Sequence, residues 1–478
     1  MLSKTYLAAE DSSTESSPLT GNAKSIAKDG HSPWSSRVAD RYGMQLPPDL
    51  AAWFDSELWC MAGPGEFASA VAPQILLDEA PGTIWPPLMP PFFLPLLTND
   101  AGDWLCLRLR EGNGPTDVCH WYHGGGDWIP WGKSLAEAIL FDCVLPRLPG
   151  ADQRHAEPAE TMRPSMCVDE AADHPWCNWA TGQVGISSAL LKEPTGSALA
   201  EMMIQRSVSE VAVRCQCVID ALSNPLAAIA SPSLAERCHL RWHDLMHWAF
   251  DLRQLPSGMA RQLADQTSLH LGDLSPSHQD WSAVTKHARE VSQQAPDLAW
   301  GHELLAYDHH CAGDHESAAG DFAAALRCSV YTDQSVRLGT HWSTARVRDP
   351  SKMAAYFLSQ DTYQAYRLDP RKQLVGDSIH RIPDAVKDVD LLEVLSGPNS
   401  RSRAMSYFEG LADSLVEHSP ASAAALYLAA GWDQGAEPMQ AFAGLLIKLA
   451  DACEQAGWKA HATLAAVHRR CLQTRYGL

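Results

Sequence analysis

Residues 103–140 read DWLCLRLREGNGPTDVCHWYHGGGDWIPWGKSLAEAIL, and this stretch decides the fold that we predict. Leu105, Leu107 and Leu109 alternate with other residues at period 2. That spacing predicts a strand with one buried face, because successive side chains of a strand point to opposite sides. A polar connection containing glycine follows, and residues 117–122 then predict a returning antiparallel strand.

Two signals complete the stretch. Residues 124–126 are three glycines, which predict a tight turn into a short third strand at residues 128–131. Ser134 and Glu137 then stand three residues apart at the head of an apolar run. This is the capping-box pattern of a helix start, in which the serine side chain accepts a hydrogen bond from a free backbone N–H. Antiparallel strands followed by a helix indicate a small α+β domain.

The segment before these strands predicts a first helix. Pro47 and Pro48 precede a run whose apolar side chains recur at helical spacing, and proline is suited to the first turn of a helix. Residues 59–92 are rich in proline and glycine, so we expect mostly loop there.

The block from Arg41 to Val144 resembles the SUKH superfamily, which contains the fungal Smi/Knr cell-wall regulators and many bacterial immunity proteins. The residues that carry the resemblance are Leu46-Pro47-Pro48-Asp49-Leu50, Leu94-Pro95-Leu96, Gly102-Asp103, Val118, Trp121, Ser134-Leu135 and Ala138-Ile139. The resemblance implies an antiparallel sheet with flanking helices, and it implies binding to other proteins without catalytic residues. The long proline-rich insert between Trp59 and Phe92 and the HGGGDW segment depart from the family pattern.

Composition shifts predict four parts. Residues 1–36 are rich in Ser, Thr, Gly and Lys and predict a disordered tail, and residues 37–150 form the SUKH-like α+β domain. Residues 151–198 predict a linker with room for one short element. Residues 199–478 carry long apolar patterns at helical spacing and predict a mainly α-helical region of repeats.

The helical region contains a repeat, clearest at residues 280–329. Asp280 and Asp314 lie 34 residues apart, and each opens a predicted helix. The segment 301–329 resembles a tetratricopeptide repeat, with small, large and small interlocking positions at Ala318, Phe322 and Ala325. An unrelated antiparallel helical hairpin remains the alternative.

The charge and the cysteine content limit the classes of function that we expect. The chain of 478 residues has 57 acidic and 37 basic side chains, a formal net charge of −20. This balance argues against binding nucleic acid or an anionic membrane, since both need basic surface. The 13 cysteines lack framework spacing and no apolar leader is present, so we expect free thiols in the cytoplasm. The longest apolar run, residues 84–97, contains five prolines and cannot form a spanning helix.

Two histidine sets could carry chemistry. Cys119, His120 and His123 offer a thiol and two imidazoles, but strand alternation separates Cys119 from His120, so no metal site is predicted. The second set recurs at i, i+4 and i+8 along one helix face, namely His239, His243 and His247. These side chains could chelate a metal in an enzyme, or they could be a polar face packed on another helix.

Trp121, Tyr122, Trp128 and Trp131 place four large aromatic side chains within eleven residues. Alternation should leave some of these rings exposed as a binding surface, whereas the alternative is that all four are buried in the core. We therefore predict a protein-interaction protein without cofactor, whose partner is a toxin or a regulatory client. A metal-dependent enzyme using the His239 helix and a purely structural scaffold are the alternatives.

Overall fold

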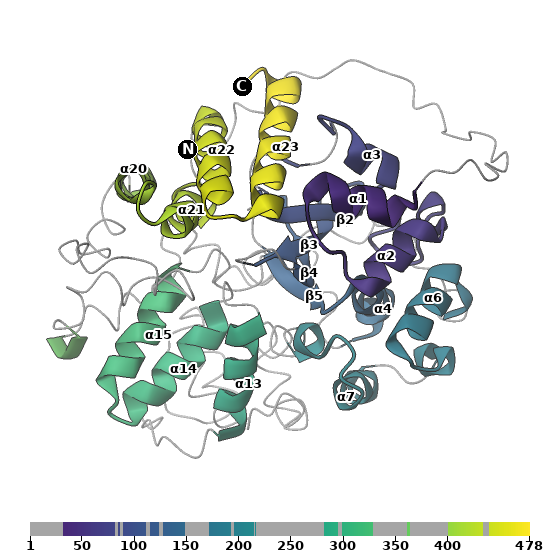
Figure 1. The fold of residues 1–478 in the computed structure, drawn as a ribbon. Helices are drawn as coiled ribbons and strands as arrows, with labels where there is room; N and C mark the ends of the chain where they lie inside the picture. Colours follow the sequence, from purple (N-terminus) through teal and green to yellow (C-terminus); the bar gives the residue numbers. More distant parts are fainter. Residues whose placement is uncertain are drawn as a thin grey trace, which may run out of the picture. The chain divides into compact units, whose positions relative to one another are not determined.

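The structure is a computed structural model, and it describes residues 32–81, 85–86, 89–110, 115–123, 128–148, 172–192, 196–214, 216, 282–294, 299–327, 361–363, 400–433 and 439–478 (Figure 1). Residues 1–33 and 34–478 are separate units, and every element below belongs to the second. Most of the predicted tail, residues 1–31, lies outside the described residues. Helix α1 (Trp34–Tyr42) begins inside the predicted tail and buries Val38 and Tyr42.

The N-terminal part contains an antiparallel meander of five strands in the order β1-β2-β3-β4-β5. The strands are β1 (Ser69–Ala70), β2 (Phe93–Thr98), β3 (Trp104–Leu109), β4 (Pro115–Trp121) and β5 (Trp128–Gly132). Strands β3, β4 and β5 confirm the three strands that the sequence predicts. The expected antiparallel sheet with flanking helices is therefore present.

Strand β2 is a strand that local patterns do not predict, because Pro95 lies inside it. Proline has no N–H for the ladder and is tolerated in sheets at bulges and edges. The register of β2 against β3 shifts between Pro95 and Leu97, and β1 pairs only with Leu97 and Thr98. Pro95 therefore lies at an irregularity beyond the end of β1, where its missing donor costs little.

Both faces of the sheet are buried, which corrects the expectation that β3 has one buried face. On the side that we call the α4 face, His120 of β4 lies opposite Leu105 and Ile129. On the other side, the far face, Trp121 lies opposite Trp104 and Trp128. Every residue of β3 is buried. Alternation still holds, but each face has its own cover.

Different segments supply the two covers. Phe141 of helix α4 (Leu135–Val144) contacts Trp131 edge-on at 4.8 Å between ring centroids, which covers the α4 face. On the far face, the sulfur of Met89 lies 3.9 Å from Cys106 Sγ. Trp85 Nε1 donates to the carbonyl of Phe93 at 2.8 Å. The proline-rich insert that was expected to be loop thus contributes to the core.

The two predicted helix starts are confirmed. Helix α2 (Pro48–Asp55) has proline in its first turn. Ser134 Oγ accepts from the N–H of Glu137 at 3.2 Å, and Glu137 Oε2 accepts from the N–H of Lys133 at 3.1 Å. The two bonds form a variant of the capping box on α4, because Glu137 reaches the residue before the N-cap rather than the N-cap itself. Shorter elements in this part are η1 (Leu58–Cys60), α3 (Pro73–Leu77) and η2 (Leu145–Arg147).

Part of the predicted linker packs on the sheet domain. Residues 151–198 include helix α6 (Pro175–Val184) and η5 (Ser188–Lys192), and α7 (Ser197–Gln205) follows. Helix α6 contacts α4. Trp176 meets Trp53 edge-on at 4.9 Å and donates to the carbonyl of Leu58 at 2.9 Å. These linker residues therefore belong to the core of the sheet domain.

The described C-terminal part is mainly helical. Its helices are α13 (Ser282–Gln294), α14 (Ala299–Cys311), α15 (His315–Arg327), α20 (Ser400–Leu415), α21 (Pro420–Leu428), α22 (Met439–Gln455) and α23 (Lys459–Tyr476), with shorter turns η7 (Asp361–Tyr363) and η10 (Ala429–Asp433). Successive helices contact each other within α13–α15 and within α20–α23. Gly313 and Gly457 supply the left-handed φ values of +76° and +77° that two of the hairpin turns need. On α15, Ala318 and Phe322 are buried, and the side chain of Ala325 lies outside the described residues.

The last helix also contacts the N-terminal part of the chain. His461 of α23 meets Phe92 edge-on at 4.3 Å between ring centroids. Cys471 Sγ lies 3.1 Å from the carbonyl oxygen of Pro81. The two halves of the chain thus share part of their cores, although their sequences are far apart.

Candidate functional site

The four aromatic side chains predicted as a binding surface are all buried. Their exposed fractions are 1% for Trp121, 7% for Tyr122, 3% for Trp128 and 0% for Trp131. The expectation that some of these rings face outward is therefore wrong. Because both faces of the sheet are covered, the strand alternation divides the rings between two core layers and leaves none on the surface.

Each layer packs these rings in its own way. Tyr122 and Trp131 lie on the α4 face, where the imidazole of His120 stacks on Tyr122 at 3.8 Å and meets Trp131 edge-on at 4.7 Å. Trp128 lies on the far face beneath the guanidinium of Arg108, whose Cζ is 4.3 Å from the ring centroid. Trp128 thereby covers a buried ion pair, because Arg108 Nε donates to Asp117 Oδ1 at 2.7 Å.

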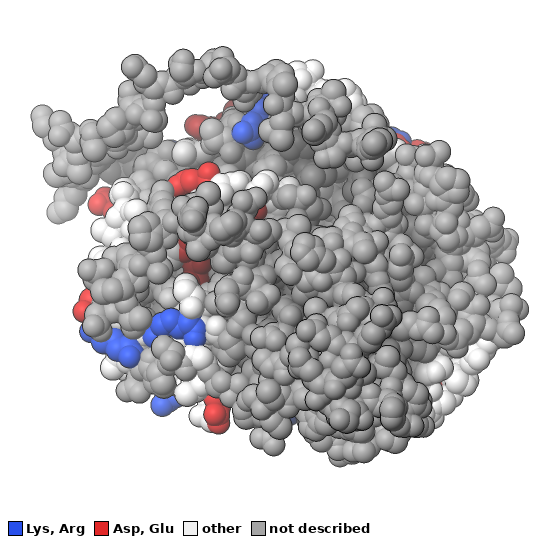
Figure 2. Space-filling view, turned by 180° about the vertical axis from the view of Figure 1, so that it is seen from behind, with Lys and Arg blue, Asp and Glu red and all other residues white. Residues whose placement is uncertain are grey.

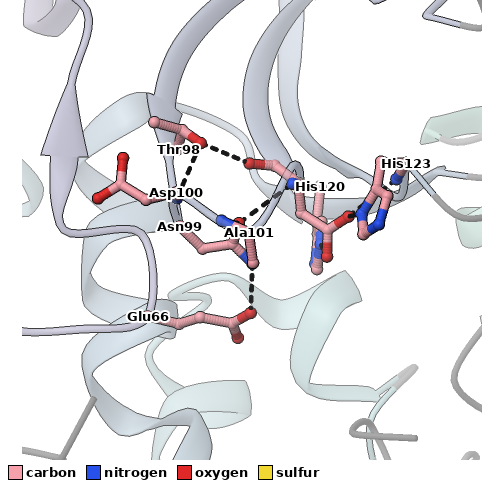
Figure 3. A network of polar contacts seen from close by, with 8 residues as sticks. Glu66, Thr98, Asn99, Asp100, Ala101, His120 and His123 are labelled. Atoms are coloured by element: carbon pink, nitrogen blue, oxygen red, sulfur yellow. Dashed lines mark hydrogen bonds and ion pairs between the residues drawn. The ribbon is translucent and has the colours of Figure 1, made fainter. Parts of the chain in front are cut away.

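The loop between β2 and β3 builds a polar cluster that the sequence patterns do not reveal (Figure 3). Asn99 Oδ1 accepts from the backbone N–H groups of Ala101 and Asp103, at 2.9 and 3.1 Å. Asn99 Nδ2 donates to Glu66 Oε1 at 3.0 Å, and Thr98 Oγ1 donates to the carbonyl of Asp103 at 3.0 Å. These bonds hold the loop so that the carboxylate of Asp103 faces the end of β4.

Two histidines meet the Asp103 carboxylate there. Asp103 Oδ1 accepts from the backbone N–H of His123 at 2.8 Å and lies 2.7 Å from His123 Nδ1. Asp103 Oδ2 lies 3.4 Å from His120 Nε2. Burial alone would raise the pKa of Asp103, but the neighbouring His120 imidazole and the hydrogen bonds from His123 outweigh it and lower the pKa to about 2. The carboxylate is thus ionised at neutral pH.

This cluster orients an imidazole at the surface. The side chain of His123 is 56% exposed, whereas that of His120 is 4% exposed. A carboxylate that fixes one imidazole nitrogen is half of a general-base arrangement, which also needs a nucleophile beside the other nitrogen. Among the described residues, no hydroxyl or thiol hydrogen-bonds to His123.

Hairpin register could have located this cluster. Trp104 pairs with Trp121, so Asp103 lies level with the residues that follow β4. Cys119 points away from the cluster, as alternation predicts, and its thiol lies 3.7 Å from the carbonyl oxygen of Cys106. Within the described ranges, no group of three or more His, Cys, Asp or Glu side chains is placed to hold a metal ion. His239, His243 and His247 lie outside the described residues.

A cavity of about 370 Å³ opens at the other end of β3 and β4. The residues lining it are Arg110, Asp117, Pro130, Gly132, Lys133, Ser209, Glu210, Val211, Ala212 and Gln293. The lining carries two basic and two acidic side chains together with the serine hydroxyl. Figure 2 shows the same mixture of signs among the described residues on the face that it presents.

The start of α4 connects two of the residues that line this cavity, Lys133 and Ser209. The Glu137 carboxylate, which accepts from the N–H of Lys133, also accepts from the N–H of Ser209 at 3.0 Å. Ser209 Oγ donates to the carbonyl of Glu137 at 2.8 Å. Burial raises the pKa of Glu137, although these two N–H donors act in the opposite direction. One carboxylate thus joins the start of α4 to residues 209–212, which lie beyond the predicted linker.

No protein-family model matches the chain, and no curated protein or solved structure matches it either. None of the described helices is long and apolar enough to cross a membrane.

Proposed function

We propose that this chain is a non-catalytic protein-interaction protein, with a SUKH-like binding domain followed by tetratricopeptide-like helical repeats. The order of elements supports the first half: a helix, antiparallel strands and a closing helix follow one another as the resemblance implies. Helices α13, α14 and α15, each of 13 residues, support the second half. The client is a toxin, if the protein confers immunity, or a regulatory protein.

The cavity beside Lys133 is the observation that carries this proposal. Small-molecule sites are mostly apolar with a few convergent polar groups. This cavity is also lined mostly by apolar surface, but its charged side chains have both signs, and Asp117 pairs with Arg108 while Glu210 pairs with Arg214 at 2.9 Å. Mixed charges beside apolar walls suit an anchoring side chain of a protein partner, with the charges selecting the partner.

A charge reversal at the cavity tests the proposal. Lys133 is exposed, and only its backbone takes part in the capping box. The partner is first isolated by its binding to the wild-type chain. Lys133→Glu should leave the melting temperature unchanged and lower the affinity for this partner at least tenfold, as measured by titration calorimetry. Lys192→Glu is the matched control, because Lys192 makes a surface ion pair with Asp173 away from the cavity. Equal affinity of both variants would refute the cavity as the binding site.

Metal analysis separates this proposal from the enzyme alternative. The purified chain should carry less than about a tenth of an equivalent of zinc, iron or manganese, since a metal centre requires three or four converging ligands. Stoichiometric metal that is lost in a His243→Ala, His247→Ala variant would favour the enzyme.

A further inference from the structure

Helices α4 and α6 bring two cysteines together. Cys143 lies on α4 and Cys177 on α6, and their sulfur atoms are 2.9 Å apart although the residues are 34 positions apart in sequence. A disulfide has a sulfur separation of about 2.05 Å, so a movement of roughly 1 Å would join them. Cys177 is fully buried, whereas Cys143 is partly exposed.

Tryptophan packing holds the two helices at this distance. Trp176, the neighbour of Cys177, meets Trp53 edge-on and donates to the carbonyl of Leu58 at 2.9 Å. A Cβ added to Gly63 would lie 2.2 Å from the Trp176 ring, so this ring has little freedom to move. The approach of the sulfur atoms is thus built into the core rather than left to a surface loop.

We propose that Cys143 and Cys177 are a reversible thiol–disulfide switch that locks α6 onto α4. The oxidant is a low-molecular-weight disulfide such as oxidised glutathione. The partly exposed Cys143 loses its proton and attacks one sulfur of the oxidant, whose S–S bond breaks; the departing thiolate takes up a proton. Cys177 then loses its proton, attacks the Cys143 sulfur and expels the second thiol. Two cysteine thiols give up two electrons and two protons, and the oxidant becomes two thiols.

The surroundings of Cys143 make formation of the disulfide slow at neutral pH. The hydrogen bond with Cys177 and then burial raise the pKa of Cys143 well above its usual value, and Arg147 opposes them only weakly. Because the thiolate is the attacking form, oxidation should accelerate as the pH rises. In a reducing compartment both residues remain thiols, in keeping with the free cysteines expected from the sequence.

Peptide mapping of the intact chain tests the proposal. The reduced protein is incubated with oxidised glutathione, its remaining thiols are alkylated under denaturing conditions, and the digest is analysed by mass spectrometry. We expect a peptide that links Cys143 to Cys177, its loss on treatment with dithiothreitol, and an oxidised protein that melts a few degrees higher. Recovery of both cysteines in alkylated form would overturn the proposal, as would a stable glutathione adduct on Cys143.

Two variants make the result specific. In Cys177→Ala the second step is lost, so glutathione should stay attached to Cys143 and the melting temperature should not rise on oxidation. In Cys453→Ala, which removes a buried cysteine with no sulfur partner among the described residues, the 143–177 link should form as in the wild type. Formation of the link at the same rate at pH 7 and pH 9 would contradict the proposed thiolate attack.

Discussion

At the scale of single residues, the position of Asp103 shows how burial and charge compete. Its carboxylate is mostly buried, yet contacts from His120 and His123 keep it ionised. Gly102 makes room for this arrangement: its φ is +112°, and a Cβ there would lie 2.9 Å from the His123 ring. A side chain at residue 102 would therefore strain the backbone and displace the imidazole.

The lowered pKa of Asp103 predicts a pH dependence of stability. A carboxyl whose folded pKa is about 2, against 3.8 unperturbed, stabilises the fold above pH 4 and loses that contribution as the pH falls toward 2. The shift corresponds to roughly 2 kcal/mol. Asp103→Asn should therefore lower the unfolding free energy at pH 6 by about that amount and leave a flatter profile below pH 4, measured by urea denaturation. The exposed Asp78→Asn serves as control; a wild-type profile in Asp103→Asn would refute the argument.

The burial of Trp128 predicts that its side chain stabilises the folded core. Its ring contacts Phe93 edge-on at 5.6 Å and covers the Arg108–Asp117 ion pair. Trp128→Ala should lower the unfolding free energy by about 3–5 kcal/mol, as large-to-small changes of core aromatic residues do. Trp59→Ala, at a half-buried ring, should cost clearly less. A loss below 1 kcal/mol for Trp128 would mean that the ring does not support the core.

At the scale of elements, glycine sets the distance between α13 and α14. A Cβ added to Gly301 would lie 2.6 Å from Ser292 Oγ and 3.1 Å from the carbonyl oxygen of Ala288. The two helices therefore approach too closely for a larger side chain. Gly320, on α15, has nothing within 4 Å of an added Cβ. Glycine thus permits close packing of two helices at residue 301, whereas at residue 320 it only lowers the stability of its own helix.

These two glycines give a matched pair of variants. Gly301→Ala should push α13 and α14 apart and cost about 1–3 kcal/mol, as overpacking does. Gly320→Ala should stabilise its helix by roughly 0.5–1 kcal/mol, because alanine loses less backbone entropy than glycine. Hydrogen exchange of α13–α15 followed by mass spectrometry should show faster exchange in the first variant and slower exchange in the second. The same direction of change in both would contradict the packing argument.

At the scale of the whole unit, helix α23 ties the end of the chain to its beginning. His461 and His468 are both fully buried on this helix. Burial lowers the pKa of His461 to about 4 and that of His468 to about 3, and the nearby backbone of Arg110 and Pro86 offsets it only in part. Both imidazoles are therefore neutral in the folded chain at neutral pH.

The two histidines predict sensitivity to mild acid. Because their folded pKa values lie below the unfolded value of 6.5, their contribution is present above pH 6.5 and is lost as the pH falls toward 4. The loss of each histidine's contribution should lower the unfolding free energy by about 2 kcal/mol between pH 7 and pH 5. His461→Phe combined with His468→Phe should remove most of this slope in urea titrations. His418→Phe, at an exposed position, should keep the slope, and a wild-type slope in the double variant would refute the assignment.

The sequence by itself determined the local elements that depend on few neighbouring residues. Alternating leucines predicted β3, the Ser134–Glu137 pair predicted the capping box of α4, and Pro48 marked the start of α2. Each is a short-range pattern whose physics is complete within one turn or one strand. The coarse division into a sheet with flanking helices and a mainly helical remainder followed from the same patterns.

Only the tertiary structure decided what covers the sheet and which polar groups meet. Trp128 is buried because Met89, Trp85 and their segment contribute to the cover of the far face, and Asp103 reaches His123 because the hairpin register places them together. The sulfur atoms of Cys143 and Cys177 meet because Trp176 docks α6 on α2 and η1. Burial and these side-chain contacts depend on residues that are distant in the chain. A spacing of apolar residues at a period of two or of 3.6 carries no information about such distant residues.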